Sequence, residues 1–140
     1  MSTRTTIASV LILLSALILA ACGRDDSSSG EKAIKSTKSV DTTITLSSAS
    51  GEIKAGENDL MLSFTDASGK PVDVSAASLK FHMPVMGSMA EMNDVATLTT
   101  AETGKFHARV DIEVAGSWEA MISFQGPRGT EQATMSVNAK

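Results

Sequence analysis

The chain has 140 residues, 16 acidic against 12 basic side chains, and a single cysteine. This mildly acidic balance argues against a nucleic-acid partner, because binding to a phosphate backbone depends on clustered Lys and Arg. One cysteine cannot form an internal disulfide, and the length suits one small domain with one hydrophobic core.

The first 21 residues have the organisation of a secretory signal peptide. Arg4 lies in a short polar segment, and the apolar run of residues 7–21 is short and rich in small residues for a membrane span. Its end, Leu19-Ala20-Ala21-Cys22, resembles the bacterial lipobox, which implies a lipoprotein anchored in the lipid bilayer by fatty acyl chains such as palmitate on Cys22. The alternative is an uncleaved N-terminal anchor with an incidental cysteine. Either arrangement places the remainder of the chain outside the cytoplasm.

Two further expectations concern the segment after Cys22. In lipoproteins of this type an aspartate after the cysteine usually retains the protein in the inner membrane, so Gly23 favours the outer membrane, facing the periplasm, in a cell that has one. Residues 25–38 are mostly serine, lysine and acids, a composition that cannot repay the entropy of ordering. We therefore expect residues 22–39 to be a flexible tether and residues 40–140 to be the folded domain.

Beyond the tether, apolar and polar residues alternate with a period of two, which indicates half-buried strands. The first expected strands are residues 43–46, 60–64, 79–83 and 95–98, with turn chemistry at residues 66–71. Leu60, Leu62 and Phe64 share one face of the second, and Leu79, Phe81 and Met83 share the inward face of the third.

The second half of the domain continues the same pattern. Residues 106–114 alternate strictly, residues 118–124 and 133–137 follow as two more strands, and a turn at residues 126–129 separates them. About seven strands at this spacing predict an all-β fold, a single immunoglobulin-like β-sandwich. Without a disulfide, burial of Trp118 and the four phenylalanines must hold its two sheets together.

The most informative motif is a methionine at every third position from residue 83 to residue 92. Thioethers are polarisable ligands that suit Cu(I), and Pro84 should end the strand and place the following residues in a loop at one end of the sandwich. The candidate ligands for a Cu(I) cofactor are His82, Met83, Met86, Met89 and Met92. The alternative is packing, with Met83 as the last inward residue of its strand and the other three methionines closing the end of the sandwich.

Other residues carry weaker signals. Met61, His107 and Met121 occupy outward strand positions, so the simplest interpretation of each is a lone surface residue. His107 and Met121 are less favoured ligands, and Met121 would lie near His82 if their strands pair. A solvated face is the simplest interpretation of the acids, namely Asp73, Asp94, Asp111 and Glu113. No nucleophile elbow, phosphate-binding glycine loop or zinc spacing is present in the sequence, so no enzyme activity is expected.

The order of motifs is similar to that of a known family. Gly69-Lys70-Pro71, then residues 82–89, Gly104-Lys105-Phe106 and Gly116-Ser117-Trp118-Glu119 resemble the YtkA-like family of exported immunoglobulin-like domains, which is related to the FixH proteins, over about residues 52–138. The resemblance implies that fold and a link to copper or cation handling.

Periplasmic Cu(I) chaperones of the PCuAC type offer a second comparison. His82-Met83 and Met92 match the early part of their motif, but the residue two positions after His107 is Arg109 where those chaperones have methionine.

These observations predict an envelope lipoprotein that binds or transfers Cu(I), in copper tolerance or oxidase assembly. Its expected partners are the lipid bilayer and a membrane copper transporter or an oxidase assembly protein. The alternative is a non-metal interaction or scaffold module of the cell envelope, which would use the same apolar loop as a contact surface.

Overall fold

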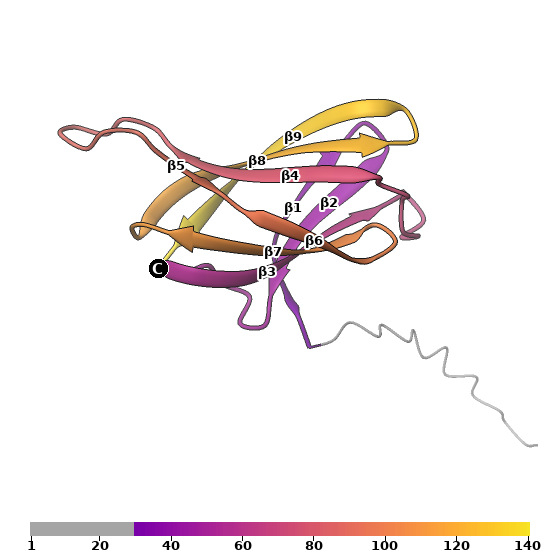
Figure 1. The fold of residues 1–140 in the computed structure, drawn as a ribbon, viewed down its shortest axis with the longest axis horizontal. Coiled ribbons are helices and arrows are strands. Elements are labelled where there is room, and N and C mark those ends of the chain that lie inside the picture. Colours follow the sequence, from indigo (N-terminus) through magenta and orange to yellow (C-terminus); the bar gives the residue numbers. More distant parts are fainter. Residues whose placement is uncertain (1–29) are drawn as a thin grey trace, which may run out of the picture.

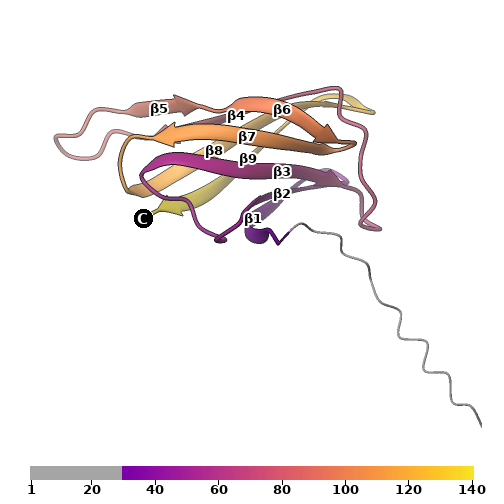
Figure 2. The same cartoon turned by 60° about the horizontal axis from the view of Figure 1, so that its bottom comes forward.

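The structure is a computed structural model that describes residues 30–140, and within that range it contains nine β-strands in two antiparallel sheets (Figure 1). The strands are β1 (Lys32–Ser39), β2 (Thr42–Ser48), β3 (Gly56–Thr65), β4 (Ala76–Met83), β5 (Met92–Val95), β6 (Thr97–Glu102), β7 (Lys105–Ile112), β8 (Gly116–Gly126) and β9 (Gly129–Ala139). One sheet has the order β1-β2-β3-β7-β6 and the other the order β5-β4-β8-β9. The two sheets pack face to face (Figure 2), which confirms the predicted β-sandwich.

The core lies between the sheets and contains the residues that alternation placed inward. Trp118 is fully buried and donates its indole Nε1–H to the carbonyl of Val114 over 3.1 Å. The ring of Phe64 meets Phe106 edge to face at a centroid distance of 5.9 Å and Phe124 at 4.8 Å. Since Phe64 and Phe106 come from one sheet and Phe124 from the other, these rings join the two sheets, as predicted for a chain without a disulfide.

The expected boundary between tether and domain is wrong for the eight residues of β1. This strand pairs with β2 from Ser39 opposite Thr42 to Lys32 opposite Ser48, and Ser39 Oγ donates to Glu131 of β9 over 2.8 Å. An edge strand is held mainly by backbone hydrogen bonds on one side, so it needs few large apolar residues; β1 supplies only Ile34 to the core. The remaining predictions for residues 1–29, including the signal peptide, Cys22 and Gly23, lie outside the described residues.

The strand count exceeds the expected seven because β1 and β5 were not anticipated as strands. Residues 95–98 were expected to form one strand, but they belong to two. β5 pairs with β4 in one sheet and β6 pairs with β7 in the other, and the buried Ala96 between them donates its N–H to the carbonyl of Leu79 over 2.9 Å. The chain therefore passes from one sheet to the other at Ala96.

Side-chain hydrogen bonds hold the turn that follows β3, and the β1–β2 turn has an unfavourable backbone conformation. Asp66 Oδ1 accepts hydrogen bonds from the backbone N–H of Ser68 and of Lys70, which confirms the predicted turn there. With the hydroxyl of Ser68, these bonds lower the pKa of the Asp66 carboxyl. Val40, in the tight β1–β2 turn, is exposed and has a φ of 48°, a left-handed conformation that is unfavourable for a β-branched residue.

Gly104, in the turn between β6 and β7, also has a positive φ, of 68°. A Cβ at this position would lie 2.6 Å from the carbonyl oxygen of Val72 and 2.9 Å from that of Phe64. The backbone of three separate segments therefore meets at a point that only a glycine can occupy without displacement.

Candidate functional site

The segment between β4 and β5, residues 84–91, extends past the ends of the other strands in both views and is here called the finger (Figures 1 and 2). It continues the β4–β5 hairpin in the same register, with Met83 opposite Met92 at its base and Met86 opposite Met89 at its tip. This confirms that β4 ends before Pro84 and that a loop at one end of the sandwich follows.

The tip of the finger is a tight turn around Gly87 and Ser88. Met89 N donates to Met86 O over 2.9 Å, and Met86 N donates to Met89 O over 3.3 Å. Gly87 has a φ of 59°, whereas Ser88 has no positive φ, which is the pattern of a type II′ hairpin turn with glycine in its first central position. The sequence Met-Gly-Ser-Met thus encodes the turn that sets its two methionines directly opposite one another.

Met86 and Met89 form an exposed pair of thioethers. Residues directly opposite in an antiparallel pair point to the same face with Cβ atoms about 5 Å apart. Their side chains are 56% and 43% exposed, so they do not close the end of the sandwich as the packing alternative proposed. Two soft ligands on flexible side chains at this separation are able to converge on one ion.

Met83 and Met92 lie on the opposite face of the hairpin, toward the core. Met83 is 4% exposed, and its terminal methyl lies 3.0 Å from the position that a Cβ on residue 116 would occupy. Met92 is half-buried and packs against the core cluster. These two residues therefore behave as the packing alternative expected, and the hairpin does not bring them together with Met86 and Met89.

His82 and Met121 lie on the outer face of the four-stranded sheet. His82 Nδ1 is 3.0 Å from Oδ1 of Asn93, and the residue four positions along, Met86, is about 13 Å away at the rise of an extended chain. The strands that carry His82 and Met121 do pair, since β4 pairs with β8 and Met121 stands opposite Lys80. Met121 is 44% exposed and diagonal to His82, remote from the tip of the finger.

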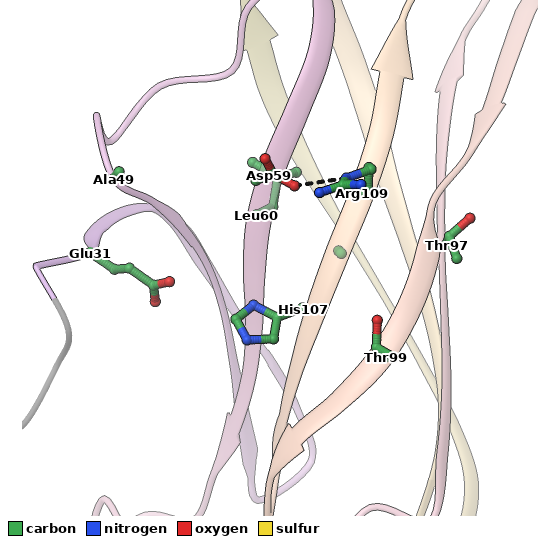
Figure 3. Close-up of a pocket in the computed structure, with 9 residues that line it drawn as sticks. Glu31, Ala49, Asp59, Leu60, Thr97, Thr99, His107 and Arg109 are labelled. Atoms are coloured by element: carbon green, nitrogen blue, oxygen red, sulfur yellow. Dashed lines mark hydrogen bonds and ion pairs between the residues drawn. The ribbon is translucent and has the colours of Figure 1, made fainter.

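His107 lies in a trough on the outer face of the five-stranded sheet (Figure 3). The trough has a volume of about 630 Å³ and is lined by Glu31, Ala49, Asp59, Leu60, Thr97, Thr99, His107, Ala108 and Arg109. Arg109 Nε donates to the Asp59 carboxylate over 3.0 Å, and this hydrogen bond together with the negative charge raises the pKa of Arg109. Figure 3 shows Glu31 projecting toward His107 from the opposite wall.

Met61 is buried, whereas the sequence predicts a surface residue. It occupies an outward position on β3, as predicted, yet it is 7% exposed because Ser47 and His107 flank it in register on the two neighbouring strands. Ser47 in turn lies within 3.5 Å of the carboxylate of Glu31, which precedes β1. Alternation reports which face a residue takes, but not whether a distant segment returns to cover that face.

No motif in the sequence points to the trough, because Asp59 and Arg109 come together only through the register in which β3 pairs with β7. The trough is lined by hydrogen-bonding groups of both charges. The thioether of Met61, which stands opposite His107, is buried. Across residues 30–140, no three His, Cys, Asp or Glu side chains gather to hold a metal ion. In the same range, no helix long and apolar enough to cross a membrane is found.

Of the four acids expected on a solvated face, three are exposed: Asp73, Asp111 and Glu113. Asp94 is half-buried, and its carboxylate accepts a hydrogen bond from the backbone N–H of Glu113 over 3.3 Å. It therefore helps to hold the short β5 against the end of β7.

An antiparallel β-sandwich in which strands β2-β3-β7-β6 of one sheet face the sheet β5-β4-β8-β9 belongs to the class of immunoglobulin-like modules. The sequence model of one family, described as YtkA-like, matches residues 36–123, which is more than half of the chain and includes the whole finger. The chain therefore belongs to the YtkA-like family, as its motifs indicated. Comparisons with curated proteins and with solved structures give no match.

Proposed function

We propose that this chain is a lipid-anchored protein of the cell envelope whose finger binds Cu(I) through Met86 and Met89 and passes it to a partner. The observation that carries the proposal is the exposed pair of thioethers set opposite one another at the tip of the hairpin. Membership of the YtkA-like family supports an envelope-associated domain. The role is binding and transfer, with no catalytic step.

The arrangement suits transfer for a chemical reason. A thioether needs no deprotonation before it binds a metal, whereas a cysteine thiol must first lose its proton. Two thioethers at the end of a hairpin leave the other coordination positions of a bound ion open, so a partner's soft ligands can enter before the methionines leave. A membrane copper transporter or an oxidase assembly protein would be such a partner.

The anchor rests on sequence. Acylation of Cys22 would hold the domain at a bilayer, the outer membrane facing the periplasm given Gly23, and would raise the effective concentration of encounters with membrane partners. Metabolic labelling with a fatty acid tests this: the label should enter the natural chain and be absent from the Cys22→Ala variant. Equal labelling of both would reject acylation at Cys22.

The copper proposal is tested by competition with a Cu(I) chelator. Residues 22–140 carrying Cys22→Ser, which removes the one competing thiol, are titrated without oxygen and without thiol reductants. The Met86→Leu/Met89→Leu variant should bind Cu(I) at least roughly tenfold more weakly, because leucine keeps the volume but lacks the ligand atom. Met121→Leu, an exposed methionine outside the finger, should bind as the parent does.

A further variant separates the two methionine pairs. Met83→Leu/Met92→Leu changes the pair on the inner face and should leave the affinity for Cu(I) unchanged. Equal affinity for the parent and Met86→Leu/Met89→Leu would reject the finger as the site.

A second candidate is a non-metal contact, and one observation favours it. Val85 cannot bind a metal, yet it is 65% exposed, on the face of the hairpin opposite to the two tip methionines. Exposed apolar side chains on a protruding loop are typical of a protein contact. If the finger acts in this way, Met86→Leu/Met89→Leu should retain a captured envelope partner in the presence of a metal chelator, and Val85→Asp should lose it.

A further inference from the structure

The finger supplies an incomplete set of soft ligands, a point that rests on the proposed Cu(I) function. Of the five residues of the motif, Met83 and Met92 face the core and His82 is about 13 Å along the strand from Met86 and bonded to Asn93. Two thioethers remain, so an ion at the tip has room for further soft ligands from outside the chain.

The segment around the tip is uncharged, so charge repulsion does not oppose the approach of the finger of a second copy of this chain. Between Met83 and Glu91 the sequence contains no charged side chain, although the chain as a whole has a formal net charge of −4. The finger also extends past the ends of the other strands, so two fingers can meet while the acidic bodies stay apart (Figure 2). Repulsion between bodies separated by more than about 10 Å is largely screened at 0.1 M salt.

We infer that a second copy of this chain completes the site, with Met86 and Met89 of two fingers holding one Cu(I) between them. Such an interface is isologous, because the same pair of residues contributes from each side of a two-fold axis. Confinement of acylated chains to one membrane would favour the encounter further.

The inference predicts a specific stoichiometry. As Cu(I) is added to the Cys22→Ser form of residues 22–140, the population of dimers should rise to a maximum near one ion for two chains. It should fall again near one ion per chain, because each finger then holds an ion of its own. Sedimentation velocity and native mass spectrometry under anaerobic conditions measure both the mass and the number of bound ions.

The same variants serve as controls. Met86→Leu/Met89→Leu should remain monomeric throughout the titration, and Met121→Leu should dimerise as the parent does. Circular dichroism of each variant checks that the fold is retained, and these exposed positions are not expected to disturb it.

The outcomes separate the two proposals. A monomer that binds one Cu(I) through Met86 and Met89 would overturn the shared site and leave the proposed function standing. A Cu(I)-dependent dimer that persists in Met86→Leu/Met89→Leu would overturn the shared site by assigning the contact to another surface. Failure of the parent to bind Cu(I) at all would overturn both.

Discussion

Replacement of Gly104 by alanine should destabilise the domain severely. The added Cβ would lie 2.6 Å from Val72 O and 2.9 Å from Phe64 O, distances that real Cβ atoms do not reach. Both oxygens are backbone atoms held in place, since Phe64 N donates to Gly104 O over 2.8 Å and Val72 N donates to Phe64 O over 3.0 Å. The neighbours cannot move aside without breaking these hydrogen bonds.

The expected loss combines two effects. An alanine in the left-handed region at a φ of 68° costs about 1–2 kcal/mol, and overpacking against fixed atoms typically costs a further 1–3 kcal/mol or so. The sum, about 2–5 kcal/mol, is a large part of the 5–15 kcal/mol or so by which native domains are stable. At roughly 4 °C per kcal/mol, the melting temperature should fall by about 8–20 °C.

Gly69→Ala is the matched control. Gly69 has a φ of 84° but no atom within 4 Å of the position of an added Cβ, so its replacement should cost only the conformational part, about 1–2 kcal/mol. Urea and thermal unfolding of the two variants measure the difference. Similar losses for both would show that the close approach at residue 104 contributes nothing, and the reasoning would be refuted.

Three further predictions concern exposed residues. Val40→Gly should raise the free energy of unfolding by about 1 kcal/mol, because glycine adopts the φ of 48° without strain; no gain in chemical denaturation would show that the turn is relaxed. Asp66→Asn should lower the melting temperature at pH 7. The folded-state pKa of this carboxyl is lowered, so its contribution is present above the unfolded value of about 3.9 and is lost as the pH falls through the folded value; a deficit that persists at low pH would contradict this cause. With hydrogen peroxide, Met86 and Met89 should form sulfoxide roughly tenfold or more faster than the buried Met135, as peptide mass spectrometry can measure; uniform rates would mean that burial does not protect a methionine here.

Much of the fold could be predicted because a period of two reports the face that each side chain takes. The inward positions of Phe64, Phe106 and Trp118 follow from alternation alone. β1 could not be predicted in this way, since an edge strand held by backbone hydrogen bonds has no apolar stripe to detect. The neighbours of Met61 are distant in sequence: Ser47 stands opposite Met61 because β2 pairs with β3, and Glu31 reaches Ser47 because β1 pairs with β2.

The candidate site shows the same limit. The loop and its methionines could be predicted from the sequence, but their even spacing of three suggested one set of ligands. In a hairpin, residues three apart fall on opposite faces, so the register divides the set into an inner pair and an outer pair. Recognising the turn at Gly87-Ser88 would have fixed that register, because a two-residue loop determines which residues stand opposite.

The passage of the chain between the sheets at Ala96 has a consequence for recognition. One leg of the finger is the end of an inner strand, β4, and the other continues through Ala96 into the second sheet, so the hairpin is rooted in both layers. A displacement of the base of the finger would have to disturb two hydrogen-bonded ladders at once. The base is therefore preorganised, and the two backbone hydrogen bonds between Met86 and Met89 shape the turn at the tip, so an ion or a partner that binds there meets two side chains whose relative position is already set.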